Sequence, residues 1–271
     1  MMWHTGRLAA FDLETTGTDV EHDRIVTGAV VGCGGFGAYV PLGWLADPGV
    51  EIPAEATAVH GISTEEARAA GEPAADVADQ IADVLARWCG DGMALVGHNV
   101  PFDLTLLDRE LRRYGREPLL DRLGDCPLHV IDTRVLDTHV LPYRRRPSAD
   151  QGARQLITLA QTYGFGWDAK AAHSSDYDAL MSARIAQRIG ELAHMSRRYW
   201  PEDLRTARRP RFHELRDLSR AELHELQVRL AAEQAEGLQR HFRKNDPAAV
   251  VDGSWPLRPW VENTENKGVR A

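Results

Sequence analysis

The chain has 271 residues, of which 43% are hydrophobic and 27% are charged. This length and composition suit one large domain, or one domain with an appendage, and exclude a disordered, collagen-like or disulfide-built chain. The formal net charge of −8 disfavours binding to phosphate groups, unless the acidic side chains gather around bound cations that reverse the local field.

The sequence predicts a cytoplasmic protein. No apolar run approaches the roughly 20 residues that are needed to cross a bilayer, so we expect no membrane association. Residues 1–7 contain no apolar stretch of the signal-peptide type. The cysteines Cys33, Cys89 and Cys126 are far apart and match no metal-ligand or disulfide pattern, which favours reduced thiols.

Apolar periodicity and turn residues predict the secondary structure in chain order. Capping boxes, in which a serine three residues before a glutamate starts a helix, occur at Ser63–Glu66 and Ser219–Glu222. The predicted strands cover residues 7–14, 24–33, 36–42, 93–96 and 129–132. The predicted helices cover residues 63–70, 75–88, 101–114, 133–141, 153–163 and 176–197.

This order predicts an α/β fold, with a mixed five-stranded sheet flanked by helices. Residues 197–211 are rich in arginine and proline and are predicted to be a linker. Beyond them, a helix is predicted that carries Leu223, Leu226 and Leu230 on one stripe. We therefore expect one domain over residues 1–196, and a linker plus helical C-terminal extension over residues 197–271.

Two acidic residues share one face of the first predicted strand. Asp12 and Glu14 alternate with Phe11 and Leu13, so both acids point to the same side of the sheet. Two acids on one face of a buried strand are costly unless a cation neutralises them. The alternative is that both are solvated where the strand ends.

Two further acids begin helices. Asp103 and Asp178 fall in predicted first turns, where the helix dipole favours a carboxylate, and capping alone would explain each of them. Together the four acids offer the oxygen ligands that Mg²⁺ or Mn²⁺ prefers. Two such ions about 3.5–4 Å apart stabilise the attacking and leaving oxygens of a phosphodiester displacement. His173, five residues before Asp178, is placed to accept the proton of the attacking water.

Three ordered motifs resemble those of the DEDDh exonucleases, the DnaQ-like group that includes the proofreading epsilon subunit of the bacterial replicative DNA polymerase. They are FDLETTG at 11–17, HNVPFD at 98–103, and the histidine and aspartate at 173 and 178. Weaker matches lie at 60–62, 132–133 and 156–164, and the resemblance covers about residues 7–192. It implies a ribonuclease H-like fold, two divalent metal ions per site, and release of nucleoside 5′-monophosphates from 3′ ends.

The resemblance also implies a role for each matching residue. The metal ligands would be Asp12, Glu14, Asp103 and Asp178, with His173 as the general base. The residues that line or position the 3′-terminal nucleotides would be Leu13, Thr15, Thr16, Asn99 and Phe102. The sister DEDDy group has a tyrosine four residues before its last aspartate, where this chain has Ser174.

The expected function is a metal-dependent 3′→5′ exonuclease acting on DNA that is single-stranded or frayed, in proofreading or repair. An exoribonuclease of the oligoribonuclease type would have the same metal site, because sugar preference depends on contacts to the 2′ position. A catalytically inactive nucleic-acid-binding or docking module is a further alternative, but it has no reason to keep a repulsive cluster of acids. Zinc binding at Cys126 and His129 is disfavoured because no second ligand pair lies nearby.

Basic residues outside the motifs offer further contacts. The run Arg144–Arg146 is either a solvated loop or a contact to a strand backbone. The arginines of residues 197–211 lie among Tyr199 and Trp200, a mixture that can hold single strands of DNA or RNA by charge and stacking. Packing as a helical appendage, or docking to a polymerase or another protein partner, are the alternatives for this region.

Overall fold

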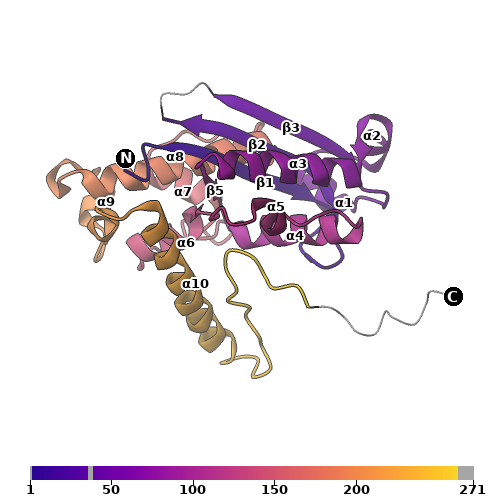
Figure 1. Ribbon diagram of the computed structural model, residues 1–271. Coiled ribbons are helices and arrows are strands. Elements are labelled where there is room, and N and C mark those ends of the chain that lie inside the picture. The colour runs from indigo at the N-terminus through magenta and orange to yellow at the C-terminus, as the bar shows by residue number, and fades with distance from the viewer. Residues whose placement is uncertain (1, 36–38, 262–271) are drawn as a thin grey trace.

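The computed structural model describes residues 2–35 and 39–261, and its centre is a mixed sheet of six strands in the order β4-β3-β2-β1-β5-β6 (Figure 1). The strands β1, β2 and β3 are antiparallel neighbours, whereas β5 and β6 continue the sheet from β1 in parallel. The strands are β1 Arg7–Thr15, β2 Ile25–Gly34, β3 Val40–Asp47, β4 Glu72–Pro73, β5 Ala94–Gly97 and β6 Val130–Asp132.

Ten α-helices and two short 3-10 helices are present in the described residues. The first five α-helices are α1 Ala54–His60, α2 Thr64–Ala70, α3 Ala74–Gly90, α4 Val100–Arg113 and α5 Leu119–Leu123. The others are α6 Thr133–Val140, α7 Leu156–Thr162, α8 Ser175–His194, α9 Glu202–Thr206 and α10 Arg220–Phe242, with the 3-10 helices at Arg197–Tyr199 and Phe212–Leu215. No helix of the described residues is long and apolar enough to cross a membrane.

The α/β fold predicted from the sequence is confirmed, with two differences in the sheet. The strand expected at residues 36–42 begins at Val40, and residues 36–38 lie outside the described residues. The five expected strands are joined by a sixth, β4, which pairs with Ala46 and Asp47 at the end of β3. A strand of two residues is too short to produce a period in the sequence, which is why it was missed.

The central strand β1 divides the core into two layers. Phe11 and Leu13 pack on the face that is covered by α3 and α4. Leu8 and Ala10 pack on the opposite face, against α8 and the chain that follows it. Side chains alternate along a strand, so Asp12 and Glu14 lie on the α8 face, at the carboxyl end of β1.

The region expected to be a linker packs against α8. Trp200, Leu204 and Phe212 are buried, and the Trp200 indole N–H donates to Leu192 O at 3.0 Å. The Trp3 indole N–H donates to Leu215 O at 3.1 Å, which ties this region to the N-terminus. The many arginines had suggested a solvated connection, but the apolar residues between them determine the packing.

Helix α10 covers the outer edge of β6, the last strand of the sheet. Both capping boxes predicted from the sequence are confirmed, and the one at Ser219 starts this helix. Gln227 is fully buried; its side chain accepts from Asp132 N at 2.7 Å and donates to Val130 O at 2.8 Å. His224 Nδ1 accepts from Val130 N at 3.1 Å. The backbone groups along this edge are therefore satisfied by side chains of α10.

Candidate active site

The end of β1 is open on the side that faces α4. Parallel pairing between β1 and β5 ends at Ala10 and Val96, so β1 extends beyond its neighbour. The freed N–H of Leu13 donates to Asp103 Oδ1 at 3.0 Å. This hydrogen bond brings the Asp103 carboxylate, from the first turn of α4, to Leu13, which is the residue between Asp12 and Glu14 in β1. A β-carbon at Gly97 would lie 3.0 Å from Phe11 O, so the close approach of the two strands favours glycine there.

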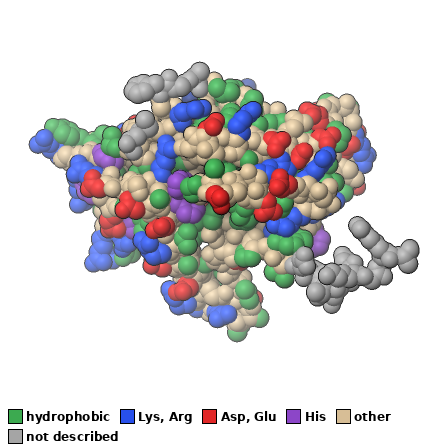
Figure 2. Space-filling view, viewed as in Figure 1, with side chains coloured by type: hydrophobic (Ala, Val, Ile, Leu, Met, Phe, Trp, Pro, Cys, Tyr) green, Lys and Arg blue, Asp and Glu red, His purple; other side chains and the backbone are tan. Residues whose placement is uncertain are grey.

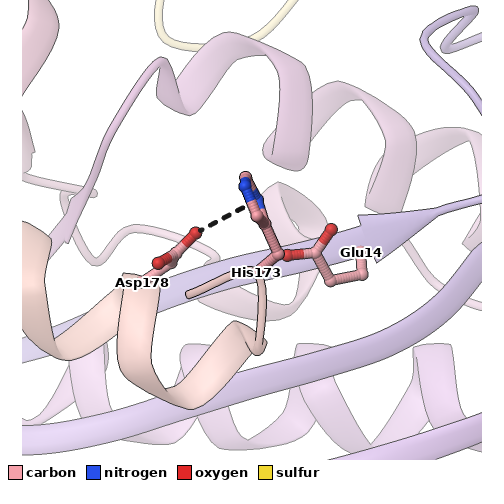
Figure 3. Close-up of side chains that lie close together, drawn as sticks. All are labelled: Glu14, His173 and Asp178. Carbon is pink, nitrogen blue, oxygen red and sulfur yellow. Dashed lines mark ion pairs between the residues drawn. The ribbon is translucent and has the colours of Figure 1, made fainter. Parts of the chain in front are cut away.

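The start of α8 brings the remaining two predicted residues to the same place. Ser175 Oγ lies 3.2 Å from Thr27 Oγ1 of β2, which holds the first turn of the helix against the sheet. His173 has a φ of 63°, a left-handed conformation that is uncommon for residues with a side chain. His173 Nδ1 lies 4.0 Å from Asp178 Oδ2, and ligand atoms of Glu14, His173 and Asp178 lie within 4.8 Å of one another (Figure 3).

The acids influence each other's ionisation. Burial raises the pKa of Asp12 well above its usual range, and the negative charges of Asp103, Asp178 and Glu14 raise it further. Burial, with the charges of Asp178 and Asp103, raises the pKa of Glu14 to about 8. Asp103 and Asp178 are thus close enough to both acids of β1 to raise their pKa values by charge repulsion.

Asp103 and Asp178 differ in what opposes the rise of their pKa. Burial raises the pKa of Asp103 to about 8, although the hydrogen bond from Leu13 N opposes the shift. Burial also raises the pKa of Asp178, to about 6, and the neighbouring His173 opposes that rise. Carboxylates held in this way are costly without a positive partner.

One atom of the cluster points to a cation. Asp178 Oδ1 is buried and has no hydrogen-bond partner among the described residues. Buried polar atoms almost always have a partner, and an oxygen of a carboxylate is the usual ligand of Mg²⁺ or Mn²⁺. The residues present therefore fit a divalent metal centre, and four hard oxygen donors with one histidine fit it better than they fit a zinc site of thiolates.

The predicted substrate residues on β1 and after it are held by the turn. Leu13 is buried in the core, and the Thr15 hydroxyl donates to Gly17 O at 2.6 Å. The Thr16 hydroxyl donates to Asp23 Oδ1 at 2.8 Å and accepts from Arg24 N at 3.0 Å. These hydroxyl groups stabilise the loop at the rim of the site, and their contacts to a nucleotide stay a prediction.

Asn99 and Phe102 lie on the opposite rim, at the start of α4. Asn99 has a φ of 67°, and its side-chain oxygen accepts from Arg134 Nη1 at 2.7 Å. Phe102 is partly buried against the core. Asn99 tolerates the left-handed conformation better than most residues do, so this geometry explains why an asparagine precedes the helix.

Two further residues help to build the site. Asp132 accepts from Asn99 N and Val100 N at 3.1 and 3.0 Å, and it also caps α6 by accepting from Arg134 N at 2.9 Å. It therefore fixes the start of α4, which carries Asp103. His60, at the end of α1, has a buried and unpartnered Nε2, and its pKa is lowered by burial and by the nearby His173. Both residues lie in the weaker motif matches of the sequence, which was the only signal for them.

Comparisons with known proteins agree on one family. A family model described as exonuclease matches residues 9–186. A DNA polymerase III subunit epsilon-like protein from Rhodobacter capsulatus is 33% identical over 190 residues, which are 66% of this chain and 23% of that protein. The DNA polymerase III subunit epsilon of Treponema pallidum is 27% identical over 190 residues, which are 68% of this chain and 79% of that protein.

A solved structure shows the same fold. Exonuclease I of E. coli in complex with a dT13 oligonucleotide matches with a TM-score of 0.57 and 21% sequence identity, covering 71% of this chain and 45% of that one. The likeness shows a ribonuclease H-like arrangement of sheet and helices. The chain spans less than half of the length of this structure and 23% of the Rhodobacter protein.

Proposed function

The chain belongs to the exonuclease family of the DnaQ-like type, whose model matches residues 9–186, and on this premise we propose that it is a metal-dependent 3′→5′ exonuclease. It hydrolyses phosphodiester bonds from the 3′ end of single-stranded or frayed DNA and releases nucleoside 5′-monophosphates. The observation that carries the proposal is the convergence of Asp12, Glu14, Asp103 and Asp178: the charges of Asp103 and Asp178 help burial to raise the pKa of both Asp12 and Glu14.

The metal centre is proposed at these four carboxylates. The unpartnered Oδ1 of Asp178 and the raised pKa of Glu14 support a cation at this point. Two Mg²⁺ or Mn²⁺ ions, when bound, supply positive charge that activates the attacking water and stabilises the leaving 3′ oxygen. Asp12 and Glu14 come from a strand, and Asp103 and Asp178 come from helix starts, so rigid elements hold all four ligands.

His173 is proposed as the general base. Its ring lies beside Asp178 and Glu14, and its side chain is 54% exposed, so it is open to the solvent from which water enters. Leu13, Thr15, Thr16, Asn99 and Phe102 are proposed to position the last nucleotides, because they flank Glu14 in the chain or lie at the start of the helix that carries Asp103.

The preference for DNA is proposed from the relatives. The two curated relatives named above are called DNA polymerase III subunit epsilon or epsilon-like, and the solved structure holds an oligodeoxynucleotide. A role in proofreading or repair, and docking to a polymerase through the C-terminal extension, rest on the same names.

The test is a parallel digestion of 3′- and 5′-labelled DNA and RNA oligonucleotides. With Mg²⁺, we expect stepwise shortening of the 5′-labelled DNA and early release of labelled mononucleotide from the 3′-labelled DNA. Excess EDTA should stop both. RNA digested faster than matched DNA would instead favour the exoribonuclease alternative.

The site assignment is tested with Asp12→Ala, which removes the carboxylate whose pKa is raised by the charges of the other three acids. We expect the rate to fall by several orders of magnitude, on the scale that metal and electrostatic catalysis supply. Glu117→Gln is the matched control, because Glu117 is exposed and lies outside the site. Wild-type rates for Asp12→Ala would overturn the assignment.

A further inference from the structure

A cleft of about 960 Å³ opens beside the carboxylate cluster. His173, Asp178, Asn99 and Arg134 are among the residues that line it. The cleft therefore starts where the 3′-terminal phosphodiester would be hydrolysed and leads away from it. The roles proposed above cover Asn99, His173 and Asp178, but they assign nothing to the other residues that line this cleft.

The charge of the cleft is opposite to that of the acidic cluster. Among the described residues that line it are three arginines, against the single acid Asp178. Arg154 is engaged, because it donates to Leu141 O at 2.7 Å and pairs with the buried Asp137. Arg134 and Arg146 are exposed and form no salt bridge within the described residues.

Trp167 supplies an aromatic ring to the lining of the same cleft. Trp167 is partly exposed, lines the cleft, and packs edge to face against Tyr177 at 5.4 Å between ring centroids. Tyr177 belongs to the first turn of α8, next to Asp178, so the indole is fixed relative to the acids. Exposed guanidinium groups beside an aromatic ring are the combination that binds a single strand through phosphates and stacked bases.

Helix α10, which lies outside the residues matched by the family model, also contributes to the lining of the cleft. Leu238 of α10 lines the cleft and is 39% exposed. The helix is fixed in this place, since Gln234 Nε2 donates to Val135 O at 3.1 Å and Gln227 holds the edge of β6. Figures 1 and 2 show α10 extending from the body of the molecule as a projection, and the chain that follows it returns along its distal half, where Gln239 is hydrogen-bonded to Ala249 and Val251.

We infer that this cleft binds the stretch of single-stranded DNA just 5′ of the terminal nucleotide. The residues that contact this stretch are Arg134, Arg146, Trp167 and Leu238 of α10. The inference rests on the proposed function for the direction of the strand. Arg134 and Arg146 contact phosphates, and Trp167 stacks on a base. The C-terminal extension thus contributes to substrate binding, and not only to the stability of the fold.

The experiment compares the full-length wild type with Arg134→Gln/Arg146→Gln, with Leu238→Glu, and with the control Arg87→Gln. Arg87 is exposed on α3 and does not line the cleft. The dissociation constant of a 5′-fluorescein dodecamer of deoxythymidylate is measured by anisotropy in EDTA at several salt concentrations. The specificity constant kcat/KM with Mg²⁺ is measured on the dodecamer and on a dinucleotide.

For the double arginine variant we expect binding to weaken about tenfold, and the slope of log Kd against log salt to fall by about 1.4, which is 0.7 for each phosphate contact. The ratio of kcat/KM for the dodecamer to that for the dinucleotide should fall about tenfold. Leu238→Glu should weaken binding about threefold, because it places a carboxylate beside phosphates. The control should stay within about twofold, with melting temperatures equal to the wild type.

Each of the other possible results would overturn one part of the inference. Equal Kd for all four proteins would overturn the cleft. An equal loss of kcat/KM on dinucleotide and dodecamer would place the arginines at the terminal nucleotide instead. An unchanged Kd for Leu238→Glu would remove α10 from the binding surface. Absence of hydrolysis by the wild type would overturn the proposed function, while the anisotropy would still decide the cleft.

Discussion

The positions of the side chains in the candidate site are set by backbone hydrogen bonds and strand pairing more than by charge. Asp103 reaches β1 because parallel pairing ends at Ala10, which leaves the N–H of Leu13 for its carboxylate. Asp178 and His173 are brought in by the anchored start of α8. The chain thus places repelling groups together by backbone hydrogen bonds, and a bound cation would stabilise the arrangement further.

The first prediction at this scale concerns His173→Ala. We expect kcat to fall by about 100- to 10,000-fold, the usual effect of losing a general base. His22→Ala is the matched control, since the His22 side chain is 84% exposed and pairs only with Asp19. Steady-state kinetics on a single-stranded DNA substrate measure both. A variant with unchanged kcat would show that another group accepts the proton.

The second concerns pH and metal. Glu14 and Asp103 have pKa values of about 8 in the folded, metal-free protein, above the ordinary values of 4.5 and 3.8. At pH values between the ordinary and the raised pKa, the folded state binds more protons than the unfolded state. The stability of the folded state therefore falls as pH rises through this range. In EDTA we expect a lower melting temperature at pH 8 than at pH 5.

Metal should reverse this trend. Because the ligands must lose their protons to bind an ion, Mg²⁺ should raise the melting temperature more at pH 8 than at pH 6, where protons compete with it. Asp103→Asn is the control, because it removes one of the titrating groups and should flatten both pH profiles. A metal effect that grows as pH falls would contradict the carboxylate site.

The elements show what the sequence could predict. Helices with a capping box or a strong apolar stripe, such as α3 and α10, were located to within a few residues. The two-residue strand β4 left no pattern. The strand expected from residue 36 is seen from Val40 onward, and residues 36–38 of the expected range lie outside the described residues. Local signals therefore located elements, but tertiary pairing decided their ends.

The candidate site was predicted in the same uneven way. The four acids lie in motifs with fixed spacing, so the sequence alone groups them. The cleft could not be found, because Arg134, Arg146 and Leu238 are far apart in the sequence and only the packing of α10 unites them. The buried Gln227 also had no signal, since its hydrogen bonds run to a strand about 95 residues away.

The third prediction belongs to this scale and concerns Gln227→Leu. The change removes partners from Asp132 N and Val130 O, which stay buried. An unsatisfied buried polar group costs about 1–3 kcal/mol, so we expect the free energy of unfolding to fall by about 2–4 kcal/mol. Urea denaturation measures it, with the exposed Glu225→Leu as control. Equal stabilities would show that α10 does not hold the strand.

At the scale of the whole molecule, we propose that residues 1–196 form the exonuclease domain and residues 197–271 a helical extension packed onto it. Residues 262–271 of this extension lie outside the described residues. The C-terminal segment also reaches α4, because Arg109 donates to Pro259 O at 3.0 Å and its guanidinium lies 5.2 Å from the Trp260 ring. The extension therefore contacts the helix that carries Asp103.

The fourth prediction tests this packing with Phe212→Ala. Phe212 is fully buried against Trp200 and Tyr163, and removal of a buried phenylalanine costs about 3–5 kcal/mol. Tyr199→Ala is the control, since Tyr199 is 65% exposed and should change stability by less than about 0.5 kcal/mol. Urea denaturation compares them. A small effect of Phe212→Ala would mean that the region after residue 196 acts as a loose tether.

The coverage of β6 by α10 has a consequence for solubility. A strand at the border of a sheet carries N–H and C=O groups that a second chain can pair with, and such borders are where proteins begin to aggregate. Here Val130 and Asp132 are already bonded to Gln227 and His224. A shortened chain that lacks this helix would expose an unpaired edge strand to other chains. We expect it to self-associate before it loses the catalytic centre.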